Sequence, residues 1–335
     1  MRVSESRQHT EIVYLSRNDV DGLDVTIKEV LGVVDEGVRL KGLGKTQMPP
    51  KPSVYPRHNC VMHPMPAYVG EMDVAGMKWI CGYPPNPAKG LPYISGLLIL
   101  SDPETGIPIT VMDATWITAV RTGASAGIAA KYLARKDTSV AGLLGCGVQA
   151  RFTLAALVET LPRLSRVRLY DLHAASAERF VAEMGPKFPH VALEICKAPG
   201  DIAAGAGVVV TAIPILREPD PEPLDAEMLE EGMLGVGLDY DVAWTQAAIR
   251  SCDRFVSDDI GQLLYGKEHS GHLRKIPDVI DAELGEIAAG VKPGRQNDTE
   301  KIFSMQMGIG IEDLVTAKLL YDRALQAGAG ARLPL

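Results

Sequence analysis

Short apolar runs alternate with stretches of helical spacing through most of the second half of the chain. The apolar runs, which we interpret as buried strands, lie at residues 140–144, 166–171, 191–196, 208–215, 233–241 and 253–259. The helical patterns between them lie at residues 150–161, 176–184, 201–206 and 224–232. Strands and helices that alternate at this pitch predict parallel βαβ units. We therefore predict an α/β fold with a doubly wound parallel sheet over residues 124–305.

The first half of the chain has a different pattern. Apolar residues recur at helical spacing between Val25 and Val38, which predicts a packing helix. Three further apolar runs predict strands, and the DPETG turn joins the last two of them; the runs lie at residues 76–82, 93–100 and 107–113. A long pattern rich in small residues, at 114–133, predicts a helix that joins the two halves. The first half therefore favours an α+β arrangement.

Two segments fit neither pattern. Residues 43–66 are crowded with prolines, which cannot occupy a helix interior, so a loop or an irregular strand is predicted there. A final helix is predicted over 310–326, and the Gly/Ala-rich tail at 328–335 is expected to be poorly ordered.

The sequence VAGLLGCGVQA, at residues 140–150, is the best candidate for a ligand-binding turn. It places a G-x-G-x-x-A pattern between a predicted strand and a predicted helix, as in the first turn of dinucleotide-binding Rossmann domains. Unpaired N–H groups at the start of such a helix favour phosphates. The predicted cofactor contacts here are Gly145, Gly147, Val148 and Gln149. The alternative is an ordinary strand-to-helix turn.

The predicted second strand of this unit ends in an acid, Asp171. A carboxylate about 20 residues after the glycine turn can bind the ribose hydroxyls of NAD. The carboxylate would repel the 2′-phosphate of NADP, and the next residues, Leu172 and His173, include no arginine to receive it, so we predict NAD. Thr211 and Ala212 stand where an apolar strand is predicted to end, and they are assigned to the nicotinamide side. A solvated acid at a strand end is the alternative for Asp171.

Composition limits the remaining possibilities. The chain has 335 residues and a net charge of −8, and its basic residues form no stripe, so nucleic acid is not an expected partner. The five cysteines are scattered and show neither a disulfide framework nor a metal-ligand spacing. There is no apolar window of the roughly 18 residues that a membrane span needs, and no signal peptide pattern. We expect a cytoplasmic two-domain protein without a metal.

Several motifs together carry a family resemblance. MKWICGYP, ITAVRTGASAGIAAKYLA, LGCGVQA and GRQNDTEKIFSMQMGIGIEDL resemble the ornithine cyclodeaminase/μ-crystallin family from about residue 45 to 320. The resemblance implies a homodimer in which residues 1–123 plus 306–335 form the dimerisation and substrate domain. The Rossmann domain at 124–305 would be inserted between these parts. Members include ornithine cyclodeaminase, alanine dehydrogenase and ketimine or imino-acid reductases.

The resemblance also assigns roles to basic residues. Arg121 matches the arginine that binds the substrate carboxylate, a role that suits a planar guanidinium, and Thr122 beside it is assigned to the cofactor. Lys78 matches the lysine of the substrate site, where burial would lower its pKa. Lys51 stands where cyclodeaminases have a second carboxylate-binding arginine. The alternatives are a surface ion pair for Arg121 and a lysine stem packed below an exposed ammonium for Lys78.

Two further positions depart from the family pattern. Asp239 matches the aspartate that cyclodeaminases use to steer a water, but Asp241 lies two residues further on, and a helix-capping role is the alternative. His63 stands where ornithine cyclodeaminase has a glutamate, which disfavours ornithine as substrate. His63 is a candidate general acid/base, or a histidine that only hydrogen-bonds within its loop.

The resemblance implies hydride transfer at the α-carbon of a small amino or imino acid, by an amino-acid dehydrogenase or a ketimine reductase that uses NAD. A cyclodeaminase that reduces and reoxidises its own NAD is the first alternative. A non-enzymatic binding protein of the μ-crystallin kind is the second.

Overall fold

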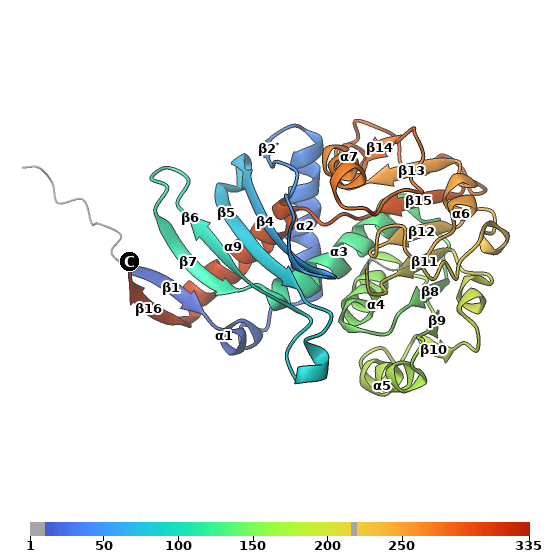
Figure 1. Ribbon diagram of the computed structural model, residues 1–335, viewed down its shortest axis with the longest axis horizontal. Coiled ribbons are helices and arrows are strands. Elements are labelled where there is room, and N and C mark those ends of the chain that lie inside the picture. The colour runs from blue at the N-terminus through green and yellow to red at the C-terminus, as the bar shows by residue number, and fades with distance from the viewer. Residues whose placement is uncertain (1–10, 216–219) are drawn as a thin grey trace, which may run out of the picture.

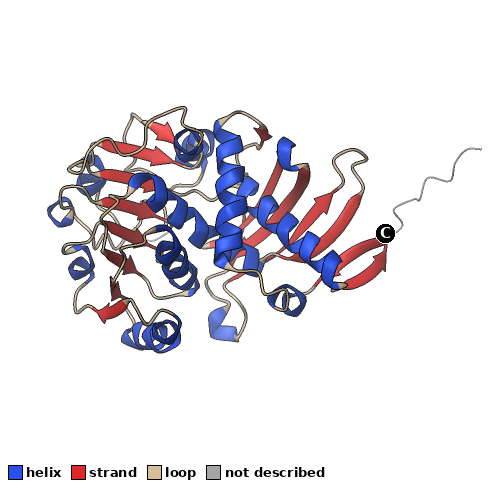
Figure 2. Cartoon of the chain, turned by 180° about the vertical axis from the view of Figure 1, so that it is seen from behind, coloured by secondary structure: helices blue, strands red, loops and turns tan. Residues whose placement is uncertain are grey.

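The chain folds around two β-sheets that lie side by side along the long axis of the molecule (Figure 1). This computed structural model describes residues 11–215 and 220–335. Helices lie between and behind the sheets (Figure 2). They are α1 (Arg17–Asp21), α2 (Ile27–Gly42), α3 (Thr115–Leu133), α4 (Val148–Thr160), α5 (Ala174–Met184), α6 (Gln246–Arg250), α7 (Ile260–His269), α8 (Leu284–Ala288) and α9 (Gly310–Ala327). Single 3-10 turns occur at Gly70–Met72, Pro87–Lys89, Gly185–Lys187, Pro199–Ala203 and Ala226–Met228.

The first sheet is mostly antiparallel, with strand order β16-β1-β7-β6-β5-β4-β2, and β3 also pairs with β4. Its strands are β1 (Glu11–Leu15), β2 (Thr46–Gln47), β3 (Val54–Arg57), β4 (Cys60–Val69), β5 (Val74–Gly82), β6 (Ile94–Ser101), β7 (Pro108–Asp113) and β16 (Ala331–Pro334). Helices α2 and α9 cover one face of this sheet, as the view from behind shows (Figure 2). The cross-strand partners Met65, Lys78, Leu98 and Met112 point to the covered face.

The second sheet is entirely parallel, and it confirms the predicted doubly wound arrangement. Its order is β10-β9-β8-β11-β12-β15-β13-β14. The strands are β8 (Val140–Leu144), β9 (Arg166–Tyr170), β10 (Ala192–Ile195), β11 (Val208–Thr211), β12 (Leu234–Gly237), β13 (Arg254–Ser257), β14 (Ala282–Glu283) and β15 (Ile302–Met305). The order reverses between β8 and β11, which is where this fold binds ligands. The insertion of β15 between β12 and β13 was not predicted.

Helix α3 connects the sheets, and its small residues explain its close packing on α4. A Cβ atom at Gly123 would lie 2.5 Å from the backbone of Phe152, and one at Gly127 would lie 2.8 Å from the Cβ of Ala156. Real Cβ contacts are not this short, so both positions require glycine. The two glycines of the RTGASAG sequence therefore let α3 lie close to α4, the helix that follows the glycine turn.

The prediction of a loop or irregular strand for the proline-rich segment was wrong for its second part. Residues Cys60–Val69 form a continuous strand that pairs with β5 along its whole length. On its other side β4 pairs with β3 up to Met62 and with β2 from Tyr68. Pro64 and Pro66 lie between these two pairings, where a residue without an N–H group loses no ladder hydrogen bond.

The prediction of a poorly ordered tail was also wrong. Residues Ala331–Pro334 pair antiparallel with β1, and Leu333 lies opposite Ile12. Gly328 ends α9 in the left-handed conformation, with a φ of 64°, and so turns the chain back toward β1. Over the described part of the chain, no helix is both long enough and apolar enough to cross a bilayer.

Candidate active site at the junction of the two sheets

A cavity of about 270 Å³ lies between the first sheet, α3 and the carboxyl ends of the second sheet. Strands β3 to β6 supply one wall, and the turn at residues 306–308, between β15 and α9, supplies another. Six of the predicted site residues line it: Lys51, His63, Lys78, Arg121, Thr122 and Gln149. The structure therefore brings together side chains from the proline-rich segment, the first sheet and both helices that flank the glycine turn.

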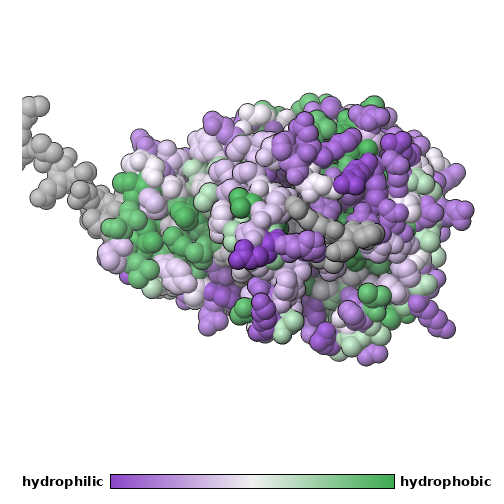
Figure 3. Space-filling view, in the orientation of Figure 1, coloured by the Kyte–Doolittle hydropathy of each residue, from purple (hydrophilic) through white to green (hydrophobic). Residues whose placement is uncertain are grey.

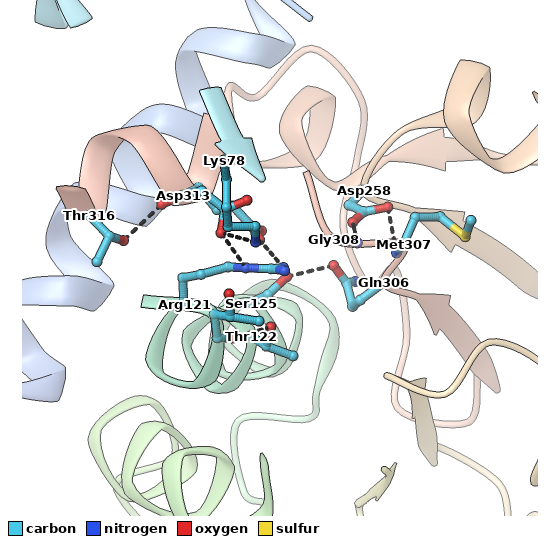
Figure 4. Close-up of polar contacts among 12 residues, drawn as sticks. Lys78, Arg121, Thr122, Ser125, Asp258, Gln306, Met307, Gly308, Asp313 and Thr316 are labelled. Carbon is cyan, nitrogen blue, oxygen red and sulfur yellow. Dashed lines mark hydrogen bonds and ion pairs between the residues drawn. The ribbon is translucent and has the colours of Figure 1, made fainter. Parts of the chain in front are cut away.

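Lys78 and Arg121 share a carboxylate at one end of the cavity (Figure 4). Oδ1 of Asp313, in the first turn of α9, accepts a hydrogen bond from Lys78 Nζ at 2.6 Å and from Arg121 Nε at 2.9 Å. Nη1 of Arg121 also lies 3.2 Å from Oε2 of Glu312. Lys78, Glu312 and Asp313 are fully buried. The alternative of a surface ion pair does not apply to Arg121, because its side chain is buried. The alternative of an exposed ammonium does not apply to Lys78, because its side chain does not reach solvent.

Burial changes the protonation of these groups. Removal from water, assisted by the positive charge of Arg121, lowers the pKa of Lys78 to about 7, although Asp313 opposes the shift. Burial raises the pKa of Glu312 to about 7, against the opposing effect of Arg121. A lysine that changes charge near neutral pH can give and take protons under physiological conditions.

The turn at 306–308 holds the guanidinium of Arg121 from the opposite side. Gly308 has a φ of 75°, and a Cβ atom there would lie 2.7 Å from Arg121 Nη1. Asp258 accepts hydrogen bonds from the N–H groups of Met307 at 2.9 Å and Gly308 at 2.7 Å. Gln306 accepts one from the hydroxyl of Ser125 at 2.8 Å. The turn is thus fixed to α3 and to the end of β13.

Lys51 lies over the same turn. Its Nζ donates to the carbonyl oxygens of Met307 and Gly308, the latter at 3.2 Å. Burial of the ammonium, together with the nearby Arg121, lowers the pKa of Lys51 to about 8. Lys51, Lys78 and Arg121 therefore gather positive charge at one end of the cavity, which suits a carboxylate ligand.

His63 faces the cavity from β4. Its Nδ1 lies 3.2 Å from the carbonyl oxygen of Pro52 and 3.2 Å from the hydroxyl of Ser53. A carbonyl can only accept, so Nδ1 carries the proton in this contact. Burial and the positive charge of Lys51 lower the pKa of His63 to about 4. The neutral ring then offers Nε2 as a hydrogen-bond acceptor at physiological pH.

The glycine turn has the geometry that a bound phosphate needs. Gly145 has a φ of 89°, and a Cβ atom there would lie 2.6 Å from the carbonyl oxygen of Ala212. A Cβ atom at Gly147 would meet no atom within 4 Å, so the space before α4 is open. Val148, 58% exposed, and Gln149 begin that helix, and Oε1 of Gln149 is buried without a hydrogen-bond partner. These residues fit a dinucleotide.

Asp171 lies beside this turn. One carboxylate oxygen accepts from the N–H group of Cys146 at 2.8 Å, and the other accepts from that of His173 at 2.8 Å. The carboxylate is therefore oriented by the backbone of the glycine turn and by that of His173.

Asp239 is buried but does not line the cavity. Its carboxylate accepts from the hydroxyl of Thr211 at 2.6 Å and from the N–H group of Ile213 at 3.0 Å. Burial raises the pKa of Asp239 to about 7. Asp241 instead accepts from the N–H groups of Leu273 and Lys275. Between the two acids, Tyr240 lines the cavity with a φ of 60°.

Sequence reasoning missed the acids behind the basic residues. Glu312 and Asp313 were part of a quoted motif, but neither was assigned a role. The available signal was a pair of acids in the first turn of a helix, flanked by the apolar Ile311 and Leu314. Within residues 11–215 and 220–335, no three His, Cys, Asp or Glu side chains are grouped so that they could hold a metal ion.

Comparison with known proteins agrees with this architecture. Alanine dehydrogenase of Archaeoglobus fulgidus is 38% identical over 96% of this chain and 98% of its own length. The structure of Δ1-pyrroline-2-carboxylate reductase of Thermococcus litoralis, in complex with NADH and L-proline, superposes with a TM-score of 0.84 at 32% identity, and the match covers 96% and 99% of the two chains.

A second solved structure, an archaeal alanine dehydrogenase dimer with bound NAD, has a TM-score of 0.84 at 34% identity and covers 97% of this chain and 99% of its own. The sequence profile of the ornithine cyclodeaminase/mu-crystallin family matches residues 11–328. The chain therefore belongs to the ornithine cyclodeaminase/mu-crystallin family.

Proposed function

We propose that this protein is an NAD-dependent oxidoreductase that acts on the α-carbon of a small amino or imino acid. The observation that carries the proposal is the buried pair Lys78 and Arg121, which lines the same cavity as Gln149 at the start of α4. The relatives above act on alanine or on a cyclic imino acid, and the solved ones contain NAD or NADH. NAD, when bound, would accept hydride from the α-carbon.

The side chains of the cavity bind the substrate and transfer its proton. Arg121, with Lys51, binds the substrate carboxylate and so fixes the α-carbon in place. Neutral Lys78 takes a proton from the substrate nitrogen during oxidation, and its ammonium returns that proton during imine reduction. The low pKa of His63 leaves it as a hydrogen-bond acceptor for the substrate. Asp239, which lies outside the cavity lining, receives no proton-transfer role.

The cofactor contacts follow the glycine turn. Gly145 and Gly147 leave room for the pyrophosphate at the N-terminus of α4, and Val148 and Gln149 offer N–H groups to it. Asp171 binds the adenosine ribose hydroxyls and so favours NAD over NADP. Thr122, Thr211 and Ala212 lie on the nicotinamide side.

A cyclodeaminase acting on a diamino acid fits the cavity less well. Among the described residues that line it, there is no aspartate or glutamate to receive a distal ammonium group. The lining is instead basic at one end and has neutral polar groups elsewhere. We therefore place the dehydrogenase or reductase first and the cyclodeaminase second.

The proposal is tested by following NADH with a panel of substrates. Amino acids are expected to give steady NADH formation, and α-keto acids with ammonium or preformed cyclic imines are expected to consume NADH. A requirement for free ammonium or methylamine indicates reductive amination, and activity with cyclic imines alone indicates a ketimine reductase. Release of ammonia without net change in NADH would identify a cyclodeaminase instead. NADPH in place of NADH tests the assignment of Asp171.

We further propose that the protein is a cytoplasmic homodimer, with residues 1–123 plus 306–335 as the dimerisation and substrate domain and 124–305 as the NAD domain. The outer face of the first sheet carries the cross-strand neighbours Met77, Trp79, Leu97 and Ile99. Figure 3 shows apolar side chains gathered at this end of the molecule. An uncovered apolar face of this kind marks an interface. The unpaired state of all five cysteines suits a reducing compartment.

A charge on this face should prevent dimerisation. Leu97 is 46% exposed, and Leu97→Asp would bury an unpaired carboxylate in the interface. We expect the variant to sediment as a monomer in analytical ultracentrifugation at micromolar concentration, where the wild type is a dimer. Ile195→Asp is the matched control, because Ile195 is also 46% exposed but lies at the edge of the second sheet. A Leu97→Asp variant that remains dimeric would exclude this face.

A further inference from the structure

Asp313 has no role in the reaction proposed above, yet it contacts both of the side chains that carry it. We propose that Asp313 is a positioning residue, which orients the amine of Lys78 and the guanidinium of Arg121 through one shared carboxylate oxygen. This inference rests on the proposed function, because it concerns the same two side chains.

The geometry supports a single anchor for both groups. Lys78 comes from β5 and Arg121 from α3, and Oδ1 of Asp313 lies 2.6 Å from Nζ of the first and 2.9 Å from Nε of the second. Oδ2 of Asp313 is buried without a hydrogen-bond partner, so no third group competes for the orientation of the carboxylate. The position in the first turn of α9 favours the negative charge through the helix dipole.

For Arg121, this contact determines which edge of the guanidinium faces the ligand. Nε is held by Asp313 and Nη1 by Glu312, and the turn at Gly308 closes against Nη1. The N–H groups that remain are those available to a carboxylate in the cavity. Without Asp313, the planar group could rotate about its last bonds, and its match to a carboxylate would be lost.

For Lys78, the contact fixes both direction and charge. When the amine is neutral, an N–H group directed at Asp313 leaves the lone pair free to point elsewhere, as a base requires. The charged and titratable groups around Lys78 are Asp313 on α9, Arg121 on α3, Lys51 in the preceding loop and His63 on β4. Asp313 is the negative member of this set, so its removal leaves the ammonium of Lys78 beside the positive charges of Arg121 and Lys51 without the carboxylate that offsets them.

The test compares Asp313→Asn with Glu312→Gln. Asparagine keeps the shape but removes the charge, so the limb of the kcat/KM pH profile that belongs to Lys78 should move to lower pH by about 1 to 3 units. Glu312 is the matched control, because it is equally buried in the same helical turn and contacts Arg121 without contacting Lys78. Glu312→Gln should raise KM and leave that limb in place.

A readout that needs no turnover separates this inference from the proposed function. In protein labelled with 15N-lysine, the Lys78 Nζ resonance is assigned by its absence in Lys78→Arg, and its titration should move in Asp313→Asn as the kinetic limb does. An unmoved titration in an active enzyme overturns the role of Asp313 alone. A moved titration in a protein that oxidises or reduces no amino or imino acid overturns the proposed function but keeps the assignment of Asp313 to Lys78.

Asp313→Glu covers the case in which Asp313→Asn does not fold. It keeps the charge but displaces the carboxylate by one methylene, so the titration of Lys78 should stay in place while kcat falls about 10²-fold, the cost of a misplacement of about 1 Å in the reacting groups. Wild-type kcat in Asp313→Glu would contradict a positioning role.

Discussion

Replacement of Lys78 by methionine is expected to lower kcat about 10²- to 10⁴-fold, the usual contribution of a general acid or base. Methionine fills nearly the same volume in the interior but cannot exchange a proton. In the wild type, kcat/KM for amino-acid oxidation should rise as pH increases through about 7, because oxidation needs the neutral amine of Lys78. Imine reduction needs the ammonium and should fall over the same range. Both limbs should vanish in Lys78→Met.

The control for this variant is Lys318→Met, on the same α9 helix that carries Asp313. Lys318 pairs with Asp322 at the surface, so its loss should leave kcat and the pH profile as they are. NAD binding, measured by calorimetry, should be similar in Lys78→Met and the wild type, because the glycine turn is intact. A Lys78→Met enzyme that binds NAD and keeps the wild-type pH limbs would remove Lys78 from proton transfer.

The second large effect is expected at Arg121. Arg121→Lys keeps the positive charge that the buried Glu312 and Asp313 require, but it loses the planar fork that can bind a carboxylate through two N–H groups. We expect KM for the amino or imino acid to rise about 10²-fold, equivalent to about 2.7 kcal/mol. The affinity for NAD should change little.

The matched control is Arg39→Lys. Arg39 pairs with Glu36 on the surface of α2, and such exposed pairs contribute little. Melting temperatures must accompany both variants, because the loss of a partner from a buried ion cluster also destabilises the fold. Two results together would show that Arg121 has no role in substrate binding. The first is that the wild type oxidises amines without a carboxylate as well as it oxidises amino acids. The second is that Arg121→Lys leaves KM for the amino or imino acid unchanged.

The centre of the second sheet could be predicted from the sequence because β8, β11 and β12 are short, continuous apolar runs. Such runs reflect burial on both faces of a parallel sheet, and the glycine turn after β8 marks the point where the strand order reverses. The position of β15 could not be predicted in this way. Its neighbours β12 and β13 precede it in the chain, and the pattern of a strand does not say which neighbours it will pair with.

Only the basic residues of the site could be predicted from the sequence. Lys78 and Arg121 stand out from apolar surroundings and belong to recognisable motifs, whereas Asp313 lies about 190 residues after Arg121 and meets it only in the folded chain. Pro64 and Pro66 misled for a related reason. A proline argues against a strand unless no neighbouring strand pairs with it at that position. β4 has such an unpaired stretch between its pairings with β3 and β2, and the sequence alone does not show it.

The separation of the cluster along the chain also sets an order for its assembly. During synthesis on the ribosome, Lys78 and Arg121 emerge well before Asp313 and Glu312, which follow every strand of the second sheet. Until α9 has been made, the two cations have no carboxylate partners, and burying them alone would cost several kcal/mol. The first sheet and α3 can therefore close over their interior only after the intervening doubly wound sheet has been translated. The nucleotide-binding half can mature first, and the chemistry becomes possible only when the late helix docks.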